Sequence, residues 1–274
     1  MSQVTRPLMT PTLSARAKTW AVRGALVGCL MALMLGAPGR WVGAGVSQIS
    51  GGRVLFTHTS GTVWHGRAQL TLAAGDSGRD AMRLPGFFEW DVGLSRAGLQ
   101  LRLSFDCCTA APLLATLAAD FHGMRVALKD QADASQWPID LLVGLGAPWN
   151  TIKANGQLQV QTHGLGLSWT EGRFQWQGRA EVKLNHISSR LSTVSPMGSY
   201  LIQILGTATP TATPEVRLST IEGPLRLSGK GQWIGQRVRF TGEASADAGF
   251  EDVLNNLLNV IGRRNGNRSI LSIG

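Results

Sequence analysis

Alternation of apolar and polar residues is the feature of this 274-residue chain that most constrains its fold. From Arg173 to Leu184, apolar and polar side chains take turns, and Gly178 is the one gap on the apolar side. Successive side chains of a β-strand point to opposite faces, so this segment places one face in a core and the other in water. The same pattern recurs at 88–94 and 99–105. The sequence therefore predicts an all-β fold.

Further strands are expected where the alternation is shorter, at 62–72, 122–129, 138–145, 156–162, 215–221, 224–230 and 236–244. Short turns that contain glycine separate many of these segments, which favours antiparallel pairing over crossover helices. A chain with 34 glycines and 16% charged residues is too apolar for disorder and too rich in glycine for a helical bundle. We expect an antiparallel, extended curved sheet or a sandwich.

Two short helices are expected to interrupt the strands. Residues 112–121 begin with Pro112, which suits a first helical turn, and carry Leu113, Leu114, Leu117 and Phe121 at helical spacing. Residues 250–261 carry an apolar stripe that stops before Gly262. The low-complexity stretch 207–214 repeats Thr, Ala and Pro and predicts an extended loop.

An uncharged run from Gly24 to Gly39 follows a basic N-terminus that has no acidic residue. A helix over this run rises about 24 Å, a little short of the ~30 Å of a bilayer core. Trp20 and Trp41 lie where interfacial aromatics are expected. We expect a cytoplasmic tail at 1–23, a single transmembrane helix at 24–46 in the cell inner membrane, and a periplasmic β domain at 47–274. A cleaved signal peptide ending near Ala44 is the alternative, and it exports the same domain.

The net charge of +9 does not indicate nucleic acid as a partner, because four of the charges lie in residues 1–23. Cysteines are few: Cys29 lies in the apolar run, and Cys107 and Cys108 are adjacent. A vicinal disulfide is possible but unusual, so two partly buried thiols are favoured. No cysteine or histidine spacing matches a metal site, so no metal is expected.

No catalytic constellation is found. The five histidines lack the H-x-x-x-H spacing, and the chain has no G-x-S-x-G, Walker A or dinucleotide-binding motif. The chain is therefore not expected to be an enzyme, nor to bind a cofactor or a small-molecule substrate.

One pattern occurs twice. Trp64–Leu72 and Trp176–Leu184 both read W-x-G-R-A-x-[LV]-x-L, which is either convergence or a duplicated β unit with halves near 47–150 and 151–274. In a strand, the Trp and Ala of each copy share one face and the Arg takes the other. The candidate partner-binding or structural residues are Gly61, Thr62, Trp64, Gly66, Arg67, Trp176, Gly178 and Arg179.

Several segments carry a family resemblance over nearly the whole chain: Ser60–Ala68 soon after the apolar run, Phe88–Trp90, Leu227–Trp233, Phe240–Gly242 and Leu254–Asn267. With these segments, the chain resembles the type II secretion system protein N (general secretion pathway protein N) family. The resemblance implies a bitopic inner-membrane protein that is an accessory component of protein secretion. Its implied partners are the secretin and the inner-membrane platform proteins.

Two functions from different classes remain open. The first is an assembly factor that docks other subunits on its sheet edges or loops, since an open edge can accept a strand. The second is a lipid-handling β-groove similar to AsmA-like periplasmic proteins. If helix 250–261 covers the aromatic residues of the sheet, the assembly function is favoured. If those residues line an open apolar trough, the lipid function is favoured. The aromatic residues in question are Trp64, Phe88, Trp90, Phe174 and Trp176.

Overall fold

The computed structural model describes residues 15–73, 81–145, 152–170, 173–207, 213–234 and 237–274. The side chains of residues 15–18, 34, 234, 237 and 273 are outside this description. The chain divides into two compact units, Met1–Pro38 and Gly39–Gly274.

The first unit consists of helix α1 (Ala15–Gly36). Helix α2 (Arg40–Ile49) already belongs to the second unit. The helix predicted at 24–46 is thus divided after Gly36, because Pro38 disfavours a helical conformation in the residue before it. In the part of the chain that the structure describes, no helix is long and apolar enough to cross a membrane. Residues 1–14 of the expected cytoplasmic tail lie outside the described residues.

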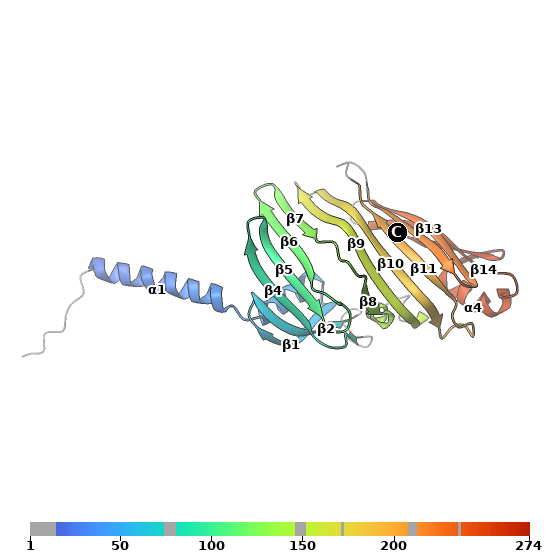
Figure 1. Ribbon diagram of the computed structural model, residues 1–274, viewed down its shortest axis with the longest axis horizontal. Helices are drawn as coiled ribbons and strands as arrows, with labels where there is room; N and C mark the ends of the chain where they lie inside the picture. The colour runs from blue at the N-terminus through green and yellow to red at the C-terminus, as the bar shows by residue number, and fades with distance from the viewer. Residues whose placement is uncertain (1–14, 74–80, 146–151, 171–172, 208–212, 235–236) are drawn as a thin grey trace, which may run out of the picture. The chain divides into compact units, whose positions relative to one another are not determined.

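The second unit is built on one antiparallel sheet, which confirms the all-β prediction and selects the single sheet over the sandwich. Its order within the described residues is β1-β2-β4-β5-β6-β7-β9-β10-β11-β12-β13-β14-β16-β15, with β3 beside β2 and β8 beside β9. Figure 1 shows the run from β4 to β11 across the middle of the sheet. The strands are β1 (Val54–Gly61), β2 (His65–Leu72), β3 (Met82–Arg83), β4 (Phe88–Ser95), β5 (Gly98–Phe105), β6 (Leu113–Asp120), β7 (Gly123–Leu128), β8 (Ser135–Pro138), β9 (Ala154–Thr170), β10 (Arg173–Ser189), β11 (Gly198–Leu205), β12 (Glu215–Glu222), β13 (Leu225–Ile234), β14 (Arg237–Ala246), β15 (Arg263–Asn265) and β16 (Arg268–Ile273).

Most of the predicted strands are present, and the predicted C-terminal helix is α4 (Glu251–Ile261). Three predictions were wrong. Residues 112–121 form strand β6 instead of a helix, and residues 139–145 form the 3-10 helix η1 (Ile139–Leu145) instead of a strand. The strand predicted from residue 62 begins at His65, because 62–64 form a turn. In the predicted loop 207–214, residues 208–212 lie outside the described residues.

Pairing on both sides explains why residues 112–121 are extended. Leu101 pairs with Ala115 and Leu99 with Leu117, and Leu117 then pairs with Val126 of β7. The apolar residues of this segment fit the spacing of a strand as well as that of a helix. Pairing with the two neighbouring strands therefore determines that it is extended. The change at residue 139 follows Pro138, which lacks the N–H that a continuing strand would donate.

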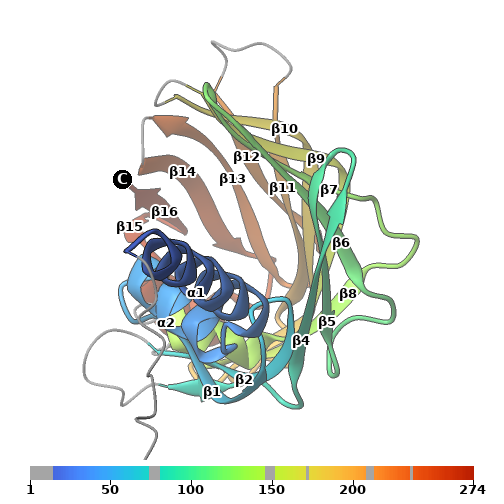
Figure 2. The ribbon, with the colours of Figure 1, turned by 90° about the vertical axis from the view of Figure 1, so that its left-hand side faces the viewer.

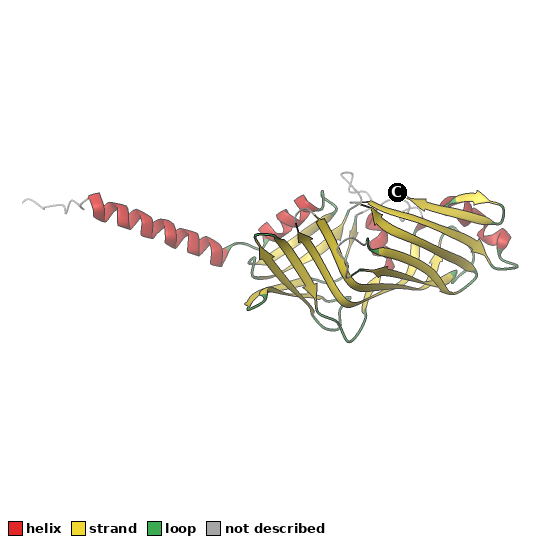
Figure 3. Cartoon of the chain, turned by 90° about the horizontal axis from the view of Figure 1, so that it is seen from above, coloured by secondary structure: helices red, strands yellow, loops and turns green. Residues whose placement is uncertain are grey.

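Two apolar clusters lie on one face of the sheet, and helices lie against that face (Figures 2 and 3). Near β1, β2 and β4, Val42 of α2 packs against a cluster of Ala68, Phe88 and Trp90. Across β9–β16, η1 and α4 cover a larger cluster whose fully buried members include Tyr200 and three leucines of α4, Leu254, Leu257 and Leu258. The Tyr200 hydroxyl donates a hydrogen bond to the Leu225 carbonyl at 3.1 Å. Helix η1 also contacts β2 and β3, where a Cβ atom at Gly144 would lie 2.7 Å from the Leu72 Cβ.

Hydrogen bonds cap the two ends of the β1 edge of the sheet. The Ser50 hydroxyl accepts a hydrogen bond from the Val54 N–H at 3.1 Å and donates to the Val54 carbonyl at 3.5 Å. At the other end, the Gly39 N–H donates to the Gly61 carbonyl at 2.9 Å. Between these caps, His58 has a φ of 51° and the register with β2 shifts, which marks a bulge.

At the opposite edge, the strand β15 is only three residues long, contains Arg263 and Arg264, and pairs with Arg268–Ile270 of β16. Short strands and arginines at an edge hinder pairing with another chain. Both edges of the sheet therefore carry features that hinder the addition of a strand.

Cys107 and Cys108 form a vicinal disulfide, which corrects the expectation of two thiols. They lie in the turn after β5, where the N–H groups of Cys108 and Thr109 both donate to the Phe105 carbonyl. This tight turn brings the adjacent side chains together. Cys108 is buried and Cys107 is exposed, while Cys29 is a free thiol in α1.

Candidate functional site

The first copy of the repeated pattern forms the corner between β1 and β2. The Thr62 N–H donates to the His65 carbonyl at 2.8 Å, and the Thr62 hydroxyl accepts from the N–H groups of Trp64 and His65 at 3.2 and 3.3 Å. Gly61 has a φ of 92°, a conformation that favours glycine, and Gly66 lies directly opposite it. The candidate residues Gly61, Thr62 and Gly66 are thus brought together by one tight turn.

The indole that fills this corner belongs to Trp90 of β4. Its Nε1–H points to the carbonyls of Thr62 and Val63, at 3.2 and 3.1 Å. A Cβ atom at Gly66 would lie 2.5 Å from the Trp90 ring, and one at Gly39 would lie 3.0 Å from it. Trp90 is only 5% exposed. The two glycines therefore shape a slot for Trp90, a residue that the sequence did not connect with the pattern.

Trp64 itself lies in the turn and is partly buried, contrary to the expectation of a buried strand residue. Its carbonyl accepts a hydrogen bond from the Val92 N–H. Arg67 is exposed, as expected for the polar face, and its guanidinium lies 5.0 Å from the centre of the Phe87 ring. Beside Arg67, a shallow depression of about 360 Å³ is lined by charged residues of β2, β4 and β5, among them Glu89, Asp91 and Arg102.

The second copy lies in a different local structure. Trp176 is inside strand β10, is partly buried, and stacks on Trp233 of β13 with the ring centres 6.4 Å apart. Gly178 has a φ of 79° at a bulge, where the register with β9 shifts. Arg179 is exposed and pairs with Glu181 at 3.4 Å. The two copies thus share a sequence pattern without sharing a conformation, and an origin by duplication stays a prediction.

Trp176 belongs to an uncovered part of the apolar face that we call the open strip: Met124, Trp169, Phe174, Trp176 and Trp233. Met124 is paired with Trp169, and Trp169 with Phe174, so these three residues share one face of adjacent strands. Met124 and Trp169 are 40% and 39% exposed. Strand β11 ends at Leu205, which lets Trp176 and Trp233 meet.

The turn between β6 and β7 presents a further apolar residue near this strip. The N–H groups of His122 and Gly123 donate to the Asp120 carboxylate at 2.8 and 3.0 Å, and the bond from His122 is the main cause of a lowered Asp120 pKa. This ordered turn holds the Phe121 side chain fully exposed. An apolar patch rimmed by polar residues is typical of a protein interaction site.

The five aromatic residues meet neither of the two conditions that were to distinguish the assembly function from the lipid function. Helix α4 packs on the Tyr200 cluster and on none of the five aromatic residues named for the test. Phe88 and Trp90 are covered from α2 instead, whereas Phe174 and Trp176 are only partly buried. The aromatic face is thus closed at one end and uncovered in the middle.

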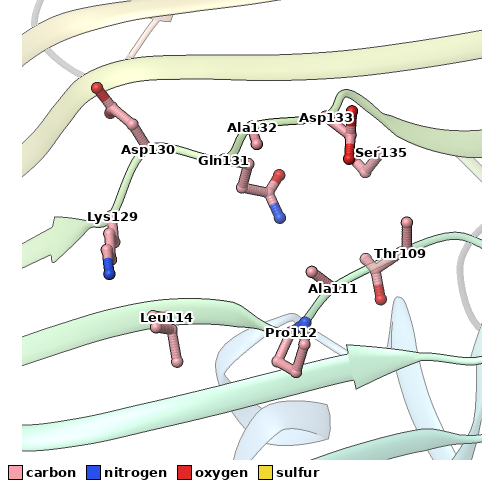
Figure 4. Close-up of a pocket in the computed structure, with 11 residues that line it drawn as sticks. Thr109, Ala111, Pro112, Leu114, Lys129, Asp130, Gln131, Ala132, Asp133 and Ser135 are labelled. Atoms are coloured by element: carbon pink, nitrogen blue, oxygen red, sulfur yellow. The ribbon is translucent and has the colours of Figure 1, made fainter.

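A small pocket of about 170 Å³ lies near the vicinal disulfide, between the start of β6 and residues 129–135 (Figure 4). Its lining is mixed and includes Pro112, Lys129 and Gln131. The Asp130 carboxylate is already used, because it accepts a hydrogen bond from the Gly164 N–H at 2.6 Å. Among the described residues, no group of three His, Cys, Asp or Glu side chains is arranged to hold a metal ion.

These features define a class: a single-sheet, antiparallel β protein whose apolar face is covered in part. Residues 52–271 match the family model described as type II secretion system (T2SS), protein N. The chain therefore belongs to the type II secretion system protein N family and is a component of that secretion system. No curated protein and no solved structure matches it. Nothing in these comparisons supports the AsmA-like alternative.

Proposed function

We propose that this chain is an accessory subunit of the type II secretion system, anchored in the inner membrane, which supports protein export across the outer membrane by binding other subunits. The observation that carries the proposal is the family match, because it spans 52–271 and thus almost the whole β unit. The proposed partners are the secretin and the inner-membrane platform proteins. The proposed role is binding, without catalysis.

The sequence of α1 supports the anchor. Its apolar side chains, such as Leu26, Leu30 and Leu35, are exposed, and basic residues precede them without any acidic residue. Such a distribution favours a cytoplasmic N-terminus and a periplasmic β unit. A phosphatase reporter fused after Gly274 should be active, and the mature protein should keep its original N-terminus. A new N-terminus near Gly45 would replace the anchor by a cleaved signal peptide and leave the export intact.

The open strip is the proposed docking surface. Hydrogen bonds already occupy the two ends of β1, so a partner that added a strand there would first have to displace them, and the short, arginine-bearing β15 hinders pairing at the other edge. A face contact needs no such displacement, and the open strip offers exposed Trp169 and Met124 beside three partly buried aromatic residues, residue types that are enriched in protein interfaces. We therefore favour docking on the face of the sheet over strand addition at its edges.

Cross-linking in cells tests this proposal. A photoactivatable amino acid at Met124 should capture the secretin or a platform protein, whereas the same group at Ile221, an exposed apolar residue of β12, should not. Deleting residues 47–274 should leave exoproteins in the periplasm. Equal capture from both positions would refute docking on the strip, and intact secretion with altered outer-membrane lipids would refute the secretion function.

A further inference from the structure

Helix α2 has two different faces. Its inner face packs on β1, where a Cβ atom at Gly43 would lie 3.0 Å from the Phe56 Cβ, and Val42 joins the Trp90 cluster. Its outer face carries the exposed residues, of which Trp41 is 53% and Ile49 is 91% exposed. A helix that is firmly packed on one side thus presents two large apolar side chains on the other.

Every charged residue within α2 or just after it in the sequence is an arginine. Arg40 opens α2, Arg53 follows it, and both are exposed. The first acidic residue of the whole chain is Asp76, which comes after α2 and the first two strands. The surface therefore combines exposed apolar side chains with arginines and has no carboxylate on its own segment.

We infer that the outer face of α2 lies on the surface of an anionic phospholipid bilayer. The inference rests on the proposed anchor, since α1 ends at Gly36 and α2 begins at Arg40. Four residues span at most about 14 Å, so a bilayer that holds the end of α1 is within reach of α2.

A bilayer surface suits this combination of residues better than a protein partner does. Tryptophan is favoured at the level of the headgroups, and arginine extends its charge there while its aliphatic part stays in apolar surroundings. Helices with an apolar side and flanking basic residues lie in the membrane interface and bind anionic lipids. Anionic headgroups attract each basic residue near the surface by a further electrostatic contribution.

The test uses the full chain in vesicles made of equal parts phosphatidylcholine and phosphatidylglycerol. Cys29→Ala removes the free thiol, and one cysteine is then introduced for a spin label in each variant: Ile49→Cys in α2, Ile221→Cys on the sheet and Leu30→Cys in α1. Collisions with oxygen report lipid, and collisions with a water-soluble nickel complex report water. We expect the label at position 49 to favour oxygen and the label at position 221 to favour nickel.

Charge variants test the electrostatic part. Arg40→Gln and Arg53→Gln should each lower the ratio of lipid-contacting to water-exposed label at position 49 by roughly fivefold. Arg102→Gln and Arg239→Gln remove two exposed arginines elsewhere and should leave the ratio unchanged. Vesicles of phosphatidylcholine alone should reproduce the effect of the first pair.

The label at position 30 distinguishes a failure of the proposed anchor from a failure of the inference about α2. If it lies in lipid while position 49 meets nickel as often as position 221 does, the inference about α2 is wrong and the anchor stands. If the Leu30 label is also in water, the anchor fails and the inference fails with it. Protection of position 49 from both reagents would mean that protein covers α2, which likewise overturns the inference.

Discussion

The two covered regions of the sheet are closed by different means. Beside α2 the cluster is aromatic: Phe88 lies 5.7 Å from Trp90 and 4.7 Å from Phe105 between ring centres, and glycines leave room for the indole. Under α4 the cluster is mainly aliphatic, and three leucines of one helix are almost completely buried. The packing of the first region depends on the space that glycines leave for a large ring. The packing of the second region depends on the leucine side chains of one helix. We therefore expect them to respond to different substitutions.

Trp90→Ala should have the largest effect. It removes a buried ring and its Nε1–H bonds to the β1–β2 corner, so the free energy of unfolding should fall by roughly 3–5 kcal/mol. Trp64→Ala should cost less, because Trp64 is only partly buried. Urea unfolding followed by circular dichroism measures both. Similar losses for the two variants would show that the aromatic cluster does not depend on Trp90 in particular.

Leu257→Ala breaks the other region. Leu257 is 1% exposed under the sheet, and its truncation leaves a cavity that should cost roughly 2–5 kcal/mol. Val253→Ala on the same helix is the control, since Val253 is 42% exposed and should change the unfolding free energy by less than about 0.5 kcal/mol. Equal effects of the two substitutions would mean that α4 is not packed as described.

Gly66→Ala sharpens the comparison, because it adds atoms instead of removing them. The new Cβ would lie 2.5 Å from the Trp90 ring, so the free energy of unfolding should drop by roughly 1–3 kcal/mol. Gly93→Ala in the same sheet is the matched control, since a Cβ there meets nothing within 4 Å. If thermal melts of the two variants coincide, the slot is wider than described.

The smallest effect is expected at the exposed entrance to α4. The side-chain hydrogen bonds from Arg226, at 2.7–3.1 Å, are the main cause that lowers the pKa of Asp247. The folded state therefore favours the charged carboxylate, and its contribution is present above the unfolded pKa and is lost as the pH falls through the folded pKa. Asp247→Asn should slightly weaken the acid dependence of the urea midpoint. In an Arg226→Gln background it should have no further effect, and a full effect there would remove Arg226 as the cause.

Alternation of apolar and polar residues was sufficient to predict the class of fold and most strands, because the alternation follows directly from strand geometry. It failed at 112–121, where the apolar residues fit both the helical and the strand period. There, pairing with β5 and β7 makes the segment a strand. Strand β11 was missed, although it pairs with β10 and β12 on its two sides. Its apolar residues are nearly continuous, which hides the period.

The candidate site could be predicted only in part. Gly61, Thr62 and Gly66 meet in one tight turn, where a positive φ and a close approach need such residues, and a role of theirs in binding a partner stays a prediction. The role of Gly66 was out of reach, since it depends on the pairing of Gly66 with Trp90, 24 positions later. The alignment of Trp64 with Trp176 was misleading for a related reason. The sequence pattern ignores where β1 turns into β2, and this boundary places Trp64 outside the strand.

The hydrogen bonds at the ends of β1 would have a consequence for many copies in one membrane, if the proposed anchor holds. Anchored molecules would diffuse in two dimensions, so their sheets would meet side by side far more often than freely diffusing ones. A bare β1 edge would then nucleate a growing ribbon of identical sheets, as cross-β polymers do. The Ser50 hydroxyl, the Gly39 N–H and the short arginine-bearing β15 deny such a ribbon its first hydrogen bonds. At high density in the membrane, the molecules should therefore stay separate and should not polymerise edge to edge.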